Sequence, residues 1–186
     1  MVLADTQLWW YTARATGIVA WVMLTAGVLW GLALSTRAFG SRPRPSWLLD
    51  LHRFLAGAAV VFTATHLLSL VLDTYVTFGL AELFVPFASS YRPSAVAWGI
   101  VALYLLLAIE ITSLLRARLS PRLWRATHFL SFPLFVVASA HAISAGTDSD
   151  ATAFRALAIG SAAAVALLTA VRTMQLEDEA PSPTGA

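Results

Sequence analysis

Residues 51–66 read LHRFLAGAAVVFTATH, an apolar stretch with a histidine near each end. Polar and ionisable side chains are costly inside a bilayer, so those that occur there are functional candidates. At about 1.5 Å of helix rise per residue, the 14 positions from His52 to His66 span roughly 21 Å. The stretch therefore predicts a membrane-spanning helix that carries one imidazole near each face of the membrane.

The composition of the whole chain is that of an integral membrane protein. Of its 186 residues, 59% are hydrophobic and 12% are charged, whereas soluble domains carry about 25% charged residues. The chain has no cysteine, which excludes disulfides, Cys-ligated zinc, iron–sulfur clusters and covalently attached haem. Its formal net charge of +2 gives no support to nucleic-acid binding. Uncharged runs of about the length that crosses a bilayer predict an all-α bundle of five transmembrane helices, over residues 15–36, 54–72, 93–109, 126–147 and 156–171.

The arginines orient this bundle. All 12 basic residues are arginines, and most of them lie in or beside the first and third loops. By the positive-inside rule these two loops face the cytoplasm, so we expect the N-terminus outside and the C-terminus in the cytoplasm. Residues 1–175 would form one membrane domain, and residues 176–186 a disordered cytoplasmic tail. The arginines concerned are Arg37, Arg42, Arg44, Arg53, Arg116, Arg118, Arg122 and Arg125.

A second stretch repeats the arrangement of the first. Residues 124–141 read WRATHFLSFPLFVVASAH, with His128 and His141 13 positions apart, which is roughly 20 Å along a helix. The two stretches contain all four histidines of the chain, and their helices, the second and the fourth, run in the same direction. His52 would then be level with His128 near the cytoplasmic face, and His66 with His141 near the outer face.

Two imidazoles that face each other at each of two depths are what bis-histidine haem ligation requires. We therefore expect the four histidines to bind the iron of two haem groups, one inner and one outer. Zinc fits less well, because each level offers two ligands and zinc takes three or four. The alternative is that the histidines only hydrogen-bond within an apolar bundle.

The second stretch does not fit a straight helix. At about 100° per residue, 13 steps leave His141 roughly 140° away from His128 around the axis. Pro133 lies between them and can kink the helix by removing a backbone donor. The sequence leaves open whether such a kink re-aims His141 or whether the two haem groups approach different sides of the helix.

The histidine spacings of 14 and 13 on alternate helices resemble those of the ferric reductase-like transmembrane domain. That family includes NADPH oxidases, ferric reductases and the haem-bearing membrane subunit of a bacterial methionine sulfoxide reductase. Trp124, four residues before His128, and the segment Ala13-Arg14-Ala15 also resemble the family. The resemblance implies two b-type haem groups that carry electrons across a membrane, and we expect that membrane to be a bacterial inner (plasma) membrane.

Two departures from the family bear on the electron donor and acceptor. The chain has no flavin motif and no glycine-rich nucleotide loop after its last helix, so the resemblance implies that electrons come from a separate flavoprotein reductase or from membrane quinol. The oxidases have a further histidine where this chain has Leu70, which argues against oxygen reduction.

Other charged residues are candidates for the site. Arg53 and Arg125 flank the inner level, where they would pair with haem propionates or serve as ordinary cytoplasmic anchors. Arg14, near the outer end of the first helix, would contact an outer propionate or an anionic acceptor, and it is the candidate catalytic residue. Glu110, in the third helix, would relay protons or pair with Arg116.

Two further features concern packing. Gly27 and Gly31 form a GxxxG pair, for which close helix packing is preferred over clearance for a cofactor. The second loop contains the apolar stretch Phe78–Ala88, which is too short to span a bilayer and is expected to form a short helix in the outer interface.

The leading interpretation is a membrane subunit that transfers electrons through two bis-histidine haem groups to or from a partner. A second is a cytochrome b subunit that takes electrons from quinol and serves a periplasmic reductase. A third is a membrane protein without redox function, whose histidines are packing groups. An absorbance spectrum distinguishes the third interpretation from the other two.

Overall fold

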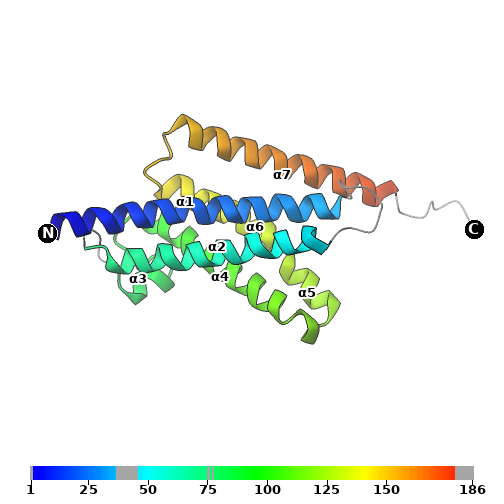
Figure 1. Ribbon diagram of the computed structural model, residues 1–186, viewed down its shortest axis with the longest axis horizontal. Coiled ribbons are helices and arrows are strands. Elements are labelled where there is room, and N and C mark those ends of the chain that lie inside the picture. The colour runs from blue at the N-terminus through cyan, green and yellow to red at the C-terminus, as the bar shows by residue number, and fades with distance from the viewer. Residues whose placement is uncertain (1, 37–45, 75, 77, 179–186) are drawn as a thin grey trace, which may run out of the picture.

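The computed structural model describes residues 2–36, 46–74, 76 and 78–178, which form helices joined by loops (Figure 1). No strand occurs in these ranges. Arg37, Arg42 and Arg44 of the first loop and residues 179–186 of the tail lie outside the described residues, so what was predicted of them stays a prediction. The elements are α1 (Val2–Ser35), α2 (Ser46–Leu72), α3 (Leu80–Phe84), α4 (Pro93–Leu114), the 3₁₀ turn η1 (Arg116–Arg118), α5 (Pro121–His128), α6 (Ser131–Ala145) and α7 (Thr152–Asp178).

Five segments of the described chain are long and apolar enough to cross a membrane. The third continues past Glu110, as expected, and the fifth is longer than its uncharged run because Arg155 and Arg172 both lie within α7. The all-α prediction with five transmembrane helices is confirmed, and the protein is a multi-pass membrane protein. The five segments are Gln7–Ser35, Ser46–Leu72, Pro93–Leu114, Pro121–Ala145 and Thr152–Leu176.

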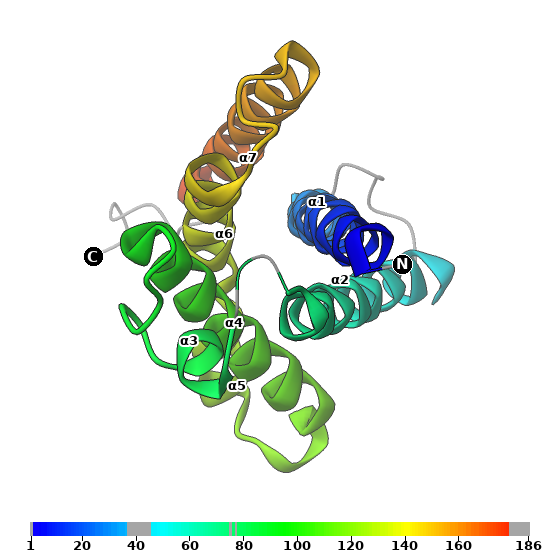
Figure 2. The same ribbon diagram turned by 90° about the vertical axis from the view of Figure 1, so that its left-hand side faces the viewer.

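The long helices pack in two groups. α1 and α2 are antiparallel and pack along their lengths, α4 packs on α6, and α2 barely touches α4. Figure 2, an end-on view, shows α1 and α2 as one group and α4, α5 and α6 as the other, with α7 beside α6. Leu32, Phe135 and Val165 form a buried cluster that joins α1, α6 and α7. The histidine-bearing helices α2 and α5–α6 therefore belong to different groups.

The fourth span is broken between its two histidines, where the sequence predicts a kink. α5 ends at His128, and α6 begins three residues later. Pro133 has no N–H to donate to the carbonyl of Phe129, and that carbonyl instead accepts from the N–H of Phe132 (3.2 Å). A hydrogen bond between residues three apart tightens the turn and changes the direction of the side chains that follow it. His141 consequently does not lie where a straight helix would put it.

The short helix expected in the second loop is α3. It lies within the stretch Phe78–Ala88, and its last carbonyl, that of Phe84, accepts a hydrogen bond from the hydroxyl of Tyr104 on α4 (2.5 Å). Arg92 donates to the carbonyl of Ser144 at the end of α6 (2.8 Å). These bonds hold the second loop and the start of α4 at the end of the bundle where α6 also ends.

Candidate functional site

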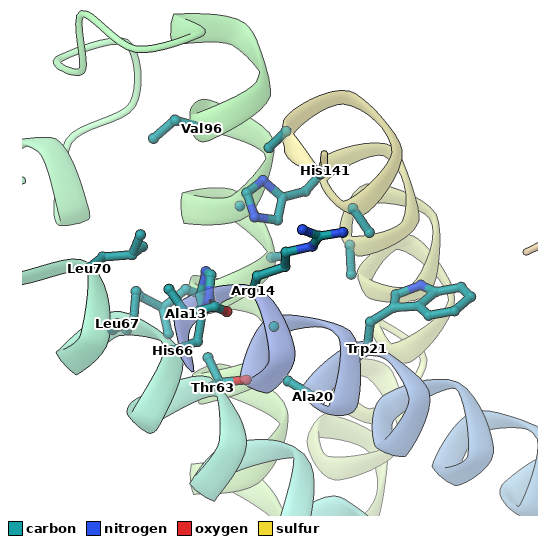
Figure 3. A pocket seen from close by; sticks show the side chains of 18 of the residues that line it. Ala13, Arg14, Ala20, Trp21, Thr63, His66, Leu67, Leu70, Val96 and His141 are labelled. Carbon is teal, nitrogen blue, oxygen red and sulfur yellow. Dashed lines mark hydrogen bonds between the residues drawn. The ribbon is translucent and has the colours of Figure 1, made fainter. Parts of the chain in front are cut away.

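The names outer pair, for His66 and His141, and inner pair, for His52 and His128, follow the predicted orientation. The outer pair lies between α2 and α6. The ring centroids of His66 and His141 are 6.4 Å apart, and the ring planes are inclined by 73°. Figure 3 shows both rings projecting into the space between these helices. The Nδ1–H of His66 donates to the carbonyl of Ala13 on α1 (2.7 Å), and that of His141 donates to the carbonyl of Ala95 on α4 (2.8 Å). Because a carbonyl only accepts, each ring carries its proton on Nδ1 and keeps Nε2 free as a metal ligand.

The inner histidine pair joins α2 to the end of α5. The ring centroids of His52 and His128 are 6.1 Å apart, with planes inclined by 71°. The indole of Trp124 stacks on His128, 5.1 Å between centroids, and the guanidinium of Arg116 lies 4.4 Å over that indole. The Nδ1 atoms of both histidines are buried and make no hydrogen bond of ordinary geometry with a described residue, although His52 lies beside the backbone of Gly27. Ring stacking by Trp124 thus supports His128 of the inner pair, whereas backbone carbonyls hold both rings of the outer pair.

Two glycines of α1 lie against the histidine rings of α2. A Cβ at Gly17 would lie 3.0 Å from Nδ1 of His66, and a Cβ at Gly31 would lie 3.2 Å from Cε1 of His52. Any larger side chain at these positions would press on the rings, which would have to shift by a few tenths of an ångström. The two glycines are 14 residues apart, as are the two histidines, and the helices are antiparallel. This equal spacing is a sequence signal that the two glycines lie against the two histidines, and the GxxxG pattern alone does not reveal it.

A third glycine, Gly99, gives clearance to the ring of His141. A Cβ at Gly99 on α4 would lie 2.7 Å from Cε1 of His141. Gly27, by contrast, has space for a Cβ, which would lie 3.8 Å from the Cβ of Leu55 in ordinary contact. The two glycines of the GxxxG pair therefore differ, since Gly27 leaves room for a side chain whereas Gly31 gives clearance to a histidine.

A cavity of about 300 Å³ adjoins the outer pair. Its wall is mostly apolar and comes from α1, α2, α4 and α6, with Leu24, Leu67, Leu103 and Leu134 as examples. Leu70 also lines it, as Figure 3 shows. The cavity lies between the two helix groups, at the level of the outer pair.

Comparison with known proteins identifies the family. The ferric reductase like transmembrane component family matches residues 16–139, about two thirds of the 186 residues. The chain belongs to this family. The matched range includes His52, His66 and His128 and ends two residues before His141. Comparison with curated proteins and with solved structures found no match.

The histidine geometry fits the haem that ferric reductase-like domains typically bind. A metal–imidazole bond measures roughly 2 Å, and the ring centre lies roughly 1 Å behind the bonding nitrogen, so two rings on one metal have centres roughly 6 Å apart. The observed separations are 6.1 and 6.4 Å. Within the described ranges, no group of three or more His, Cys, Asp or Glu side chains could hold a metal ion. Two ligands at each level suit an iron whose other positions belong to a porphyrin.

Arg14 lies beside the outer pair of this ferric reductase-like protein. It follows Ala13, whose carbonyl accepts from His66, and its side chain lines the cavity. Its Nε and Nη2 atoms both donate to the carboxylate of Asp148, in the loop between α6 and α7, and its guanidinium lies 5.2 Å over the ring of Trp10. Sequence reasoning missed Asp148, because a pairing across 134 positions depends on the path of that loop. The role predicted for Arg14 stays a prediction.

The remaining charged candidates lie near the inner pair. Arg53 is exposed and pairs with Asp50 one turn earlier (3.4 Å). Arg125 is also exposed, and neither it nor the half-buried Glu110 has an ion pair within the described part of the chain. The alternative in which Glu110 pairs with Arg116 is therefore not observed, because Arg116 stacks on the indole described above. Contacts of Arg53 and Arg125 with haem propionates stay predictions.

Proposed function

We propose that this protein transfers electrons across the membrane through two b-type haem groups, as the membrane subunit of an oxidoreductase. His52 and His128 would hold the inner group, and His66 and His141 the outer group. The observation that carries this proposal is the pair of ring separations, 6.1 and 6.4 Å, in a member of the ferric reductase family. Bound haem would supply a one-electron carrier at each level.

The chain's own residues position the ligands and limit where a substrate reacts. The carbonyls of Ala13 and Ala95 fix the proton of each outer ring on Nδ1, which raises the basicity of the ligating nitrogen. Because two histidines at each level would hold the iron of a bound haem, we expect no substrate to bind that iron directly. A redox partner of the outer group would therefore react at its edge, near Arg14.

The donor in this proposal is another molecule. A separate flavoprotein reductase on the cytoplasmic side is plausible for the ferric reductase family, and it is the donor that we propose. Membrane quinol is the alternative donor, and a periplasmic reductase would then be the acceptor. In both cases we place the N-terminus outside and the C-terminus in the cytoplasm of a bacterial inner membrane, on the arginine distribution.

Haem content tests the proposal. Full-length protein made with an adequate haem supply should contain two haem b per chain by pyridine haemochrome analysis, with a low-spin spectrum. His66→Ala and His141→Ala should each remove the outer group and leave the inner one. Leu68→Ala is a matched control, since Leu68 is an exposed residue of α2 two positions from His66. A folded protein without haem would contradict the proposal and favour histidines that only pack.

A further inference from the structure

The mouth of the outer cavity holds an ion pair that the proposed electron transfer does not explain. Nε of Arg14 donates to Oδ2 of Asp148 and Nη2 donates to Oδ1, which makes the pair bidentate. The side chains are 35% and 23% exposed, so both retain some contact with the surroundings. The ring of Trp10 lies under the guanidinium. Arg14 is thus held between a carboxylate and an aromatic face.

Carboxylates outnumber cations among the described residues that line this cavity. Arg14 is the one cation in the lining, against the carboxylates of Asp73, Glu82 and Asp148. Asp73 is buried and has a partner of its own. The side chain of Glu82 lies back over its own loop, since a Cβ at Gly79 would lie 2.8 Å from its Oε2. Asp148 is therefore the acidic residue of the lining that contacts Arg14.

We infer that Asp148 determines which charge of redox partner the outer mouth accepts. A guanidinium stays protonated at every accessible pH, so without Asp148 a full positive charge would stand beside the outer histidine pair. With Asp148 in place that charge is neutralised, so the mouth presents no free cation. Apolar walls focus the field of a free charge and change encounter rates for charged molecules. The mouth of the native protein accordingly does not attract anions, whereas loss of Asp148 would leave a cation that does.

This inference rests on the proposed function, because it concerns the partner that exchanges electrons at the outer edge. It also revises what Arg14 does. In the sequence Arg14 is a free cation that would attract an anionic acceptor, whereas in the structure its charge is already engaged. Asp148 is a specificity-determining residue that acts through Arg14 and does not itself contact the reacting group.

The test compares two one-electron acceptors of opposite charge. Hexaammineruthenium(III) is a cation and ferricyanide is an anion, and each takes one electron from the reduced protein without transfer of an atom or a proton. Stopped-flow reoxidation of full-length protein in a neutral detergent gives the rate for each. In Asp148→Asn the anion rate should rise by roughly tenfold relative to the cation rate. A change in the potential of the outer group alters the driving force for both acceptors in the same direction, so opposite changes in the two rates report the encounter.

Three variants complete the comparison. Asp150→Asn removes a carboxylate two residues away that is 90% exposed and pairs with Arg155, and it should leave the ratio unchanged. Asp148→Glu keeps the charge and should behave as the wild type. Arg14→Gln should lower the anion rate below that of the wild type, and the double variant Arg14→Gln with Asp148→Asn should bring it back.

A binding measurement needs no electron transfer. Hexacyanocobaltate(III) is a redox-inert anion of the same shape and charge as ferricyanide. It should bind Asp148→Asn in isothermal titration, with an affinity that falls as salt rises, and should not bind the wild type or Asp150→Asn. An unchanged ratio of rates in a haem-loaded Asp148→Asn, or equal binding by wild type and variant, would overturn the inference. Absence of haem from the wild type would instead overturn the proposed function, so the two failures are distinct.

Discussion

At the scale of single residues, three glycines lie directly against histidine rings. Gly99→Ala would place a methyl group 2.7 Å from Cε1 of His141, and such overpacking costs about 1–3 kcal/mol. The ring must move to relieve it, which breaks the hydrogen bond to Ala95. We expect haem content to fall from two groups per chain toward one, with the inner group retained. The measurement is haem per chain together with the thermal unfolding temperature.

The control for this substitution is Gly57→Ala on α2. A Cβ at Gly57 meets nothing within 4 Å, and alanine in place of glycine in a helix interior is stabilising by about 0.5–1 kcal/mol. This variant should keep both haem groups and unfold at the same or a higher temperature. Full haem content in Gly99→Ala would show that His141 tolerates displacement.

At the scale of elements, the break between α5 and α6 determines where His141 lies. Pro133→Ala restores an N–H that can donate to the carbonyl of Phe129, and a continuous helix would turn His141 roughly 140° away from His128. We expect the outer group to be lost in preference to the inner one. Resonance Raman or electron paramagnetic resonance spectra that resolve the two low-spin groups provide the measurement. Two unchanged low-spin signals would mean that packing around α6 holds the break without the proline.

The sequence predicts the elements well and their mutual contacts less well. Helix number, the histidine levels and the kink at Pro133 follow from local patterns, namely apolar run length, 14- and 13-residue spacings and a missing backbone donor. Two kinds of contact do not follow from local patterns: the hydrogen bonds of His66 and His141 to backbone carbonyls, and the pairing of Arg14 with Asp148. Each joins segments far apart in the chain through backbone positions or loops that carry no periodic signal. Gly17 is intermediate, since its spacing to Gly31 could have been noticed.

At the scale of the whole molecule, we propose that a separate donor supplies electrons to the two histidine levels. The purified 186-residue chain alone should not oxidise NADPH at a useful rate, because these residues contain no nucleotide or flavin pattern. Addition of a flavoprotein reductase or a quinol should reduce the haem groups, as followed by their absorbance. Rapid reduction by NADPH alone, without flavin or partner, would contradict this expectation.

On the antiparallel helices α1 and α2, the spacing between the two glycines equals the spacing between the two histidines. Gly17 lies against His66 and Gly31 against His52. Both contacts therefore depend on one and the same alignment of the two helices. Deletion of one residue between the glycines would leave every histidine and all of α2 intact, yet it would rotate one glycine away from its ring by about 100°. A change of length in either helix is therefore harmful unless the other changes with it, and the two helices behave as a single unit under insertion and deletion.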